Sequence, residues 1–114
     1  MITVGMQTER QAARYLQQQG LELIEQIYRS RYGEIDLIMC DGKTLVFIEV
    51  RLRQHAGFGG AAASINTRKQ KRIISTAQQY LAGLAHIPPC RFDAVLLEDS
   101  RGKSMQWLNN AFDA

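Results

Sequence analysis

Three acidic residues, Glu34, Asp36 and Glu49, flank a predicted β-hairpin in a pattern that suits metal chemistry. Alternate residues of a strand face the same side of a sheet, so Glu34 and Asp36 share one side. A two-residue turn at Asp41-Gly42 would place Glu34 opposite Glu49, with Asp36 diagonal to it. Because like charges across a sheet repel, the sequence predicts a compensating positive charge at this acidic patch.

That compensating charge has two possible sources. A divalent cation, Mg²⁺ or Mn²⁺, would satisfy the patch, because Mg²⁺ is commonly held by one or two carboxylates. Arg51 and Arg53 follow Glu49 on the same side of the strand, so an ion-pair network on the sheet surface is the alternative. The residues by themselves leave both interpretations open.

A second candidate site lies at the start of a predicted helix that runs from about Thr67 to Gly83. Its first turns carry Arg68, Lys69, Lys71 and Arg72. Cations are disfavoured at a helix N-terminus, whereas cations together with free backbone N–H groups form an anion site. The pattern favours contact with a phosphate backbone over the alternative of four solvated side chains.

Charged residues are unevenly distributed along the whole chain. The chain has 114 residues, a net charge of +3 and a pI of about 9.1. Residues 50–92 contain seven basic and no acidic residues, whereas residues 1–49 contain five basic and seven acidic ones. A stretch of this length without a carboxylate indicates a surface for a polyanion, and a solvated basic face is the alternative.

The predicted elements bring these residues into one α/β domain spanning 1–114. A first helix begins between Thr3 and Thr8 and ends at Gly20. The predicted strands are 21–28, 34–40, 44–53 and 91–97, with 104–108 as a candidate fifth. The order α-β-β-β-α-β predicts a mixed sheet flanked by helices, and the glycine-containing segment 54–66 is predicted to be a loop.

Composition excludes several classes of protein. No apolar stretch is long enough to cross a bilayer, and the N-terminus lacks the layout of a signal peptide. Cys40 and Cys90 are not clustered, which suits a reducing compartment and predicts a cytoplasmic protein. His55 and His86 do not combine with the cysteines into zinc-binding spacing.

The hairpin residues resemble a nuclease signature. The run Gly-Glu-Ile-Asp-Leu-Ile at 33–38, followed by Val-Phe-Ile-Glu-Val-Arg at 46–51, resembles the D…ExK pattern of the PD-(D/E)XK nuclease superfamily. Over about Thr8 to Leu97, the chain resembles the YraN-like uncharacterised protein family, predicted endonucleases related to Holliday-junction resolvases. The further matches are Glu9, Phe58-Gly59, Lys69 and Arg91-Phe92-Asp93. The resemblance implies a restriction-endonuclease-like core.

The resemblance also implies roles for individual residues. Asp36 and Glu49 correspond to the metal ligands, and Glu9 from the first helix could supply another carboxylate. Glu34 is a further candidate ligand beside them. The ion implied is Mg²⁺ or Mn²⁺, acting on a phosphodiester.

Position 51 departs from the pattern, because Arg51 stands where the superfamily has lysine. Arginine keeps the positive charge but is essentially never deprotonated, so it can stabilise an oxyanion and cannot act as a base. Lys69 is the candidate to take over the role of the lysine. Two lesser departures are Thr8, where the family favours Gly, and Ile27, where Asn is usual.

Three functions are compatible with these residues. The leading hypothesis is a metal-dependent endonuclease acting on DNA, including branched DNA, with Asp36, Glu49, Arg51 and Lys69 as catalytic residues. The residues expected to bind nucleic acid are Arg53, Arg68, Lys69, Lys71 and Arg72. Symmetric junctions would favour a homodimer. The alternatives are a catalytically silent nucleic-acid-binding module and an interaction module that binds no nucleic acid.

Overall fold

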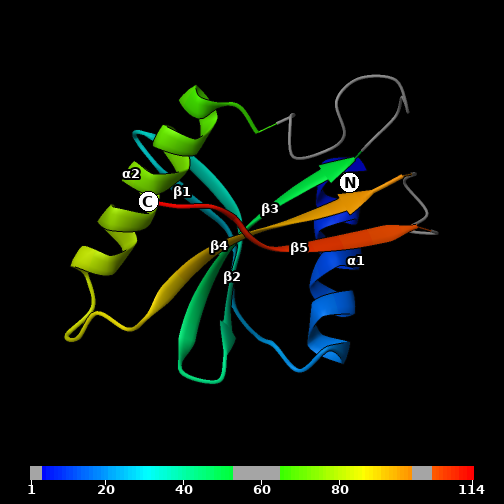
Figure 1. The fold of residues 1–114 in the computed structure, drawn as a ribbon, viewed down its shortest axis with the longest axis horizontal. Coiled ribbons are helices and arrows are strands. Elements are labelled where there is room, and N and C mark those ends of the chain that lie inside the picture. Colours follow the sequence, from blue (N-terminus) through cyan, green and yellow to red (C-terminus); the bar gives the residue numbers. More distant parts are fainter. Residues whose placement is uncertain (1–3, 53–64, 99–103) are drawn as a thin grey trace.

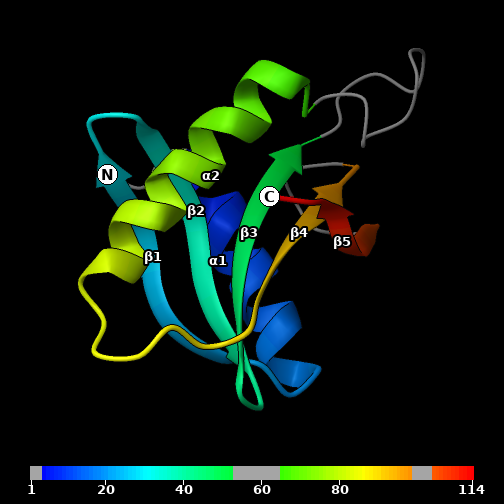
Figure 2. The ribbon, with the colours of Figure 1, turned by 60° about the vertical axis from the view of Figure 1, so that its left-hand side comes forward.

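The computed structural model describes residues 4–52, 65–98 and 104–114, so Arg53 and residues 54–64 of the predicted loop lie outside the described residues. It contains five strands and two helices, with one helix packed on each face of the sheet (Figures 1 and 2). The elements are α1 (Val4–Gln18), β1 (Glu22–Ser30), β2 (Gly33–Asp41), β3 (Thr44–Leu52), α2 (Thr67–Ala82), β4 (Cys90–Leu97) and β5 (Met105–Phe112). This order confirms the predicted mixed α/β fold and is consistent with a restriction-endonuclease-like core.

The strands lie in the order β1-β2-β3-β4-β5 across the sheet. Neighbouring strands are antiparallel except for β3 and β4, which are parallel and are joined through α2. A parallel pair requires such a crossover, and here it brings the start of α2 beside the end of β3. Neither helix in the described ranges is long and apolar enough to span a membrane.

Each face of the sheet has its own hydrophobic core. On the α1 side, Ala12 and Leu16 pack against the fully buried Val46 and other strand residues of the same face. On the α2 side, Ile73 and Phe47 belong to a second cluster. Since successive residues of β3 alternate between the two cores, both faces are buried and the sheet is the central layer of three.

The register of the β2–β3 hairpin differs from the prediction by two residues. Asp41 pairs with Thr44, so the turn residues are Gly42 and Lys43, and Leu37 faces Ile48. Gly42 has φ +62° while Lys43 has no positive φ, which is the pattern of a type II′ turn with glycine first. A slip of two residues keeps every side chain on its predicted face.

β1 contains a strained residue beside the predicted site. Ile27 has φ +57°, a left-handed conformation that is unfavourable for a β-branched side chain. The pairs on either side of it place Ile27 opposite Asp36 in the neighbouring strand. Asn tolerates this conformation better than Ile, which gives a physical reason for the Asn that the resemblance associates with this position.

Candidate functional site

One cavity brings together residues from α1, β2, β3 and α2. It has a volume of about 690 Å³, and its lining combines acidic and basic side chains. The carboxylates are Glu9, Asp36 and Glu49 with Glu34 at the side, and the cations are Arg51, Arg68, Lys69 and Arg72. Glu9 of α1 and Arg72 of α2, which are 63 positions apart in the sequence, therefore meet at a single site.

Asp36 is the centre of the acidic group. The side chains of Glu9 and Glu49 both hydrogen-bond to it, and the backbone N–H of Val50 donates to its Oδ2 at 2.8 Å. Asp36 and Glu49 are both buried. The corrected hairpin register explains this contact, because Asp36 precedes Leu37 and Glu49 follows Ile48, and Leu37–Ile48 is the last pair at the open end of the ladder.

The crowding of three carboxylates changes their proton affinities. Burial, and after it the charge of Asp36, raises the pKa of Glu9 from 4.5 to about 8. Burial and then Asp36 likewise raise the pKa of Glu49 to about 9, against the opposing effect of Arg51. The pKa of Asp36 itself is raised by burial, while the Val50 amide lowers it. Additional positive charge would therefore stabilise the ionised site.

Two cations already approach one oxygen of the group. Arg51 Nη2 lies 3.2 Å from Glu49 Oε1, and Lys69 Nζ lies 3.1 Å from the same atom. Lys69 thus lies next to Glu49, the residue that corresponds to the glutamate of the D…ExK pattern. The predicted ion-pair alternative is partly realised, since Arg51 contacts Glu49; Arg53, its other member, lies outside the described residues.

Two buried atoms in the cavity have no hydrogen-bond partner among the described residues. Glu9 Oε2 is an unpaired acceptor, and Arg51 Nε is an unpaired donor. An unsatisfied buried polar atom costs about 1–3 kcal/mol, so such atoms point to a missing partner. Glu9 Oε2 can receive a cation or a proton donor, and Arg51 Nε can receive an anion.

The start of α2 forms the basic wall of the cavity. Asn66 is its N-cap, and the Asn66 side chain accepts a hydrogen bond from the Lys69 N–H at 2.9 Å. Arg68 and Arg72 line the cavity with Lys69, whereas Lys71 is exposed on α2 and does not line it. The predicted basic helix therefore contributes three of its four cations to the site.

Glu34 lies at the cavity but differs from its predicted position. Glu34 does not face Glu49 as predicted, because of the register slip; its half-exposed side chain pairs with Arg29 at 3.2 Å. Glu34 still lines the cavity, where Glu9, which was predicted as a further carboxylate through the family resemblance, joins Asp36 and Glu49. Sequence reasoning missed Asn66 as a lining residue, although Asn directly before a predicted helix is an N-cap signal.

The donor set limits the kind of metal site that is possible. Within residues 4–52, 65–98 and 104–114, no three His, Cys, Asp or Glu side chains are arranged to hold one ion together. Asp36 and Glu49 remain as a contacting pair of hard oxygen donors, with the unpaired Glu9 Oε2 beside them. This set fits Mg²⁺, which takes one or two carboxylates and fills its other positions with water or phosphate oxygens.

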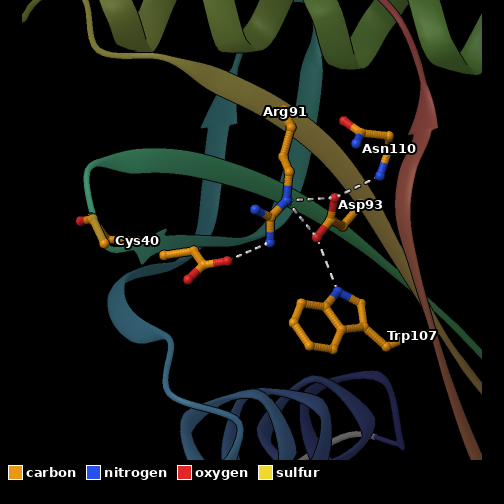
Figure 3. Close-up of polar contacts among 7 residues, drawn as sticks. Cys40, Arg91, Asp93, Trp107 and Asn110 are labelled. Carbon is orange, nitrogen blue, oxygen red and sulfur yellow. Dashed lines mark hydrogen bonds and ion pairs between the residues drawn. The ribbon is translucent and has the colours of Figure 1, made fainter.

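A second buried charge lies on the α1 side of the sheet and is structural. Asp93 is fully buried and accepts hydrogen bonds from Arg91 Nε at 3.1 Å, Trp107 Nε1 at 2.9 Å and the Asn110 N–H at 3.0 Å (Figure 3). Arg91 also pairs with Asp41 at 3.0 Å. These contacts connect three strands, so they explain the Arg91-Phe92-Asp93 motif as a fold constraint.

The fold and the cavity define an α/β protein with a buried carboxylate centre beside a basic helix. The model of a protein family described as "Uncharacterised protein family UPF0102" matches residues 8–97. A UPF0102 protein of Janthinobacterium sp. (strain Marseille) is 56% identical over 110 residues, which are 96% of this chain and 87% of that protein. One of Nitrosomonas europaea is 55% identical over 109 residues, 96% of this chain and 92% of that protein. The chain belongs to this family, which confirms the predicted resemblance to the YraN-like uncharacterised protein family.

Proposed function

We propose that the protein is a divalent-metal-dependent endonuclease of the PD-(D/E)XK type that acts on DNA. The observation that carries the proposal is the pair of unpaired buried atoms, Glu9 Oε2 and Arg51 Nε, in one cavity. A cation beside the first and a phosphate oxygen beside the second would satisfy both. A phosphodiester held next to a metal ion is the arrangement that hydrolysis of nucleic acid requires.

Each residue has a role in this proposal. Asp36 and Glu49 would hold Mg²⁺ or Mn²⁺, with Glu9 as an additional carboxylate. When bound, the ion supplies Lewis-acid chemistry that polarises the phosphate and lowers the pKa of water. Arg51 and Lys69 would stabilise the negative charge that develops on the phosphate during attack. Their shared contact with Glu49 fixes both cations beside the reacting group.

The basic wall would bind the flanking phosphates. Arg68 and Arg72 line the cavity with Lys69, and the exposed Lys71 would add a more distant contact. Preference for DNA, including branched DNA, and a homodimeric state both stay predictions from the sequence. Phosphate contacts make binding salt-dependent, so affinity for DNA should fall steeply as salt rises.

A catalytically silent DNA-binding protein is the second candidate, and Arg51 is the observation that favours it. An arginine cannot accept a proton, so it cannot replace every function of the lysine in the motif. Lys69 argues against this candidate, because its ammonium group lies 3.1 Å from the same carboxylate oxygen.

Cleavage of labelled four-way-junction and linear duplex DNA with Mg²⁺ or Mn²⁺ tests the proposal. We expect Asp36→Asn and Glu49→Gln to abolish cleavage and Lys69→Ala to reduce it by about 100-fold. Glu22→Gln, an exposed carboxylate of β1, is the matched control and should cleave normally.

Two results would contradict hydrolysis at this site. Cleavage that survives both Asp36→Asn and Glu49→Gln would come from another site or a contaminant. Activity that appears only in Arg51→Lys would show that the natural protein has lost catalysis and binds DNA without cutting it.

A further inference from the structure

A second, smaller hollow lies next to the cavity and differs from it in chemistry. It has a volume of about 360 Å³ and is lined by Tyr32, Ser75, Gln78 and Gln79. Its lining thus combines an aromatic ring with neutral hydrogen-bonding groups and contains no charged side chain. This composition suits a ligand with a planar face and polar edges better than it suits a phosphate.

The two hollows follow one stripe of α2. Residues at positions i, i+4, i+7 and i+11 of a helix lie on one side, and here these are Arg68, Arg72, Ser75 and Gln79. The first two line the basic cavity and the last two line the smaller hollow. A nucleic-acid strand whose phosphates lie along Arg68 and Arg72 would therefore continue directly to Ser75 and Gln79.

The turn between β1 and β2 closes the other side of the hollow and is fixed to α2. The Ser30 hydroxyl accepts a hydrogen bond from the Tyr32 N–H at 3.0 Å and donates to Thr76 Oγ1 at 3.1 Å. Thr76 is fully buried and donates in turn to the Arg72 carbonyl at 2.8 Å. These bonds hold Tyr32 in place before any ligand arrives, which lowers the cost of binding.

Tyr32 presents its ring to solvent next to a cation. The residue is 42% exposed. Arg31 Nη2 donates to the Tyr32 hydroxyl at 2.7 Å, and the guanidinium carbon lies 4.9 Å from the ring centroid. An exposed ring held by a guanidinium group provides a platform for stacking and a positive charge for a nearby phosphate.

We propose that this hollow binds an unpaired nucleobase of the strand whose phosphates occupy the basic cavity. The base stacks on Tyr32, and the amides of Gln78 and Gln79 hydrogen-bond to its edge. A base inside a duplex is stacked and paired, so it cannot enter the hollow. The inference rests on the proposed nucleic-acid binding and narrows the substrate class to DNA with an unpaired nucleotide near the target phosphate.

Fluorescence anisotropy with two labelled oligonucleotides of equal length tests this inference. One is oligo-dT and the other has the same backbone with abasic sites, and EDTA prevents cleavage. We expect the natural protein to bind oligo-dT more tightly. Tyr32→Ala should weaken oligo-dT binding roughly tenfold and leave abasic binding unchanged, because one stacked base is lost. Tyr32→Phe should retain the preference, and Ile24→Ala, an exposed control on β1, should match the natural protein.

The outcomes separate this inference from the proposed hydrolysis. Equal affinity of the natural protein for both oligonucleotides, or equal losses for both in Tyr32→Ala, would overturn the base site while leaving metal-dependent cleavage to its own assay. A base-dependent preference in EDTA, together with no cleavage in the separate assay with Mg²⁺ or Mn²⁺, would refute hydrolysis alone. Failure to bind either oligonucleotide at low salt would also overturn the base site, whereas hydrolysis would still be decided by cleavage of junction and duplex DNA with Mg²⁺ or Mn²⁺.

Discussion

Replacing Glu9 by glutamine tests the electrostatics of the carboxylate centre without altering its shape. The pKa of Glu9 is raised from 4.5 to about 8, chiefly by burial and then by Asp36. Near pH 7.5 this difference corresponds to a cost of about 4 kcal/mol to the folded state. Glu9 is partly exposed, so solvent screening reduces the cost to about 1–2 kcal/mol. Glu9→Gln should therefore raise Tm in EDTA by roughly 5–10 °C.

The pH dependence of this gain has a definite sign. The pKa of the Glu9 carboxyl group is higher in the folded than in the unfolded state. Its contribution to the stability of the folded state is therefore fully present below the unfolded pKa of 4.5 and is lost as pH rises through about 8. Thermal unfolding in EDTA across this range should show no difference between Glu9→Gln and the natural protein near pH 4.5, and a growing difference above it. Added Mn²⁺ should stabilise the natural protein more than the variant.

Glu22→Gln is the control, because its carboxylate is exposed on β1 and contacts neither Asp36 nor Glu49. Its Tm should stay within a degree or so of the natural protein at every pH, as surface substitutions usually do. A Glu9→Gln stability that is unchanged, or raised by the same amount at every pH, would refute the carboxylate repulsion on which the metal assignment depends.

Two further substitutions test the surrounding fold by urea unfolding. Asp93→Asn should lower the free energy of unfolding by about 3 kcal/mol, since it leaves Arg91 without its buried counter-charge, and a change below about 0.5 kcal/mol would contradict that role. Ile27→Asn should raise the free energy of unfolding by about 1 kcal/mol through relief of the left-handed strain. Ile24→Asn, on the same strand, should bring no such gain, and equal effects of the two would refute the strain.

The secondary structure was predictable because its signals are local. Gly20, the turn around Asp41-Gly42 and the double proline at Pro88 and Pro89 mark the ends of elements wherever the rest of the chain lies. The alternation of β3 likewise placed Glu49 and Arg51 on one face. Boundaries moved by only a few residues, with the largest difference at β5, which continues to Phe112.

The hairpin register was less predictable than the faces of its strands. Asp41-Gly42 and Gly42-Lys43 are both acceptable two-residue turns, and their energies differ through cross-strand packing over the whole ladder. The parity of the two registers is the same, so Asp36 and Glu49 lie on the same face of the sheet in both. The residue opposite Glu49 differs between the registers, because the shift of two residues places Asp36 there in place of Glu34.

The amino-acid order by itself determined the helices, the strands, the concentration of basic residues at 50–92 and the side of the sheet on which Asp36 and Glu49 stand. Tertiary structure alone decided that Glu9 and Lys69 reach those carboxylates and that Tyr32 faces α2. The reason is that side-chain periodicity is a property of each segment, whereas proximity between segments depends on how the helices and the parallel β3–β4 pair pack together.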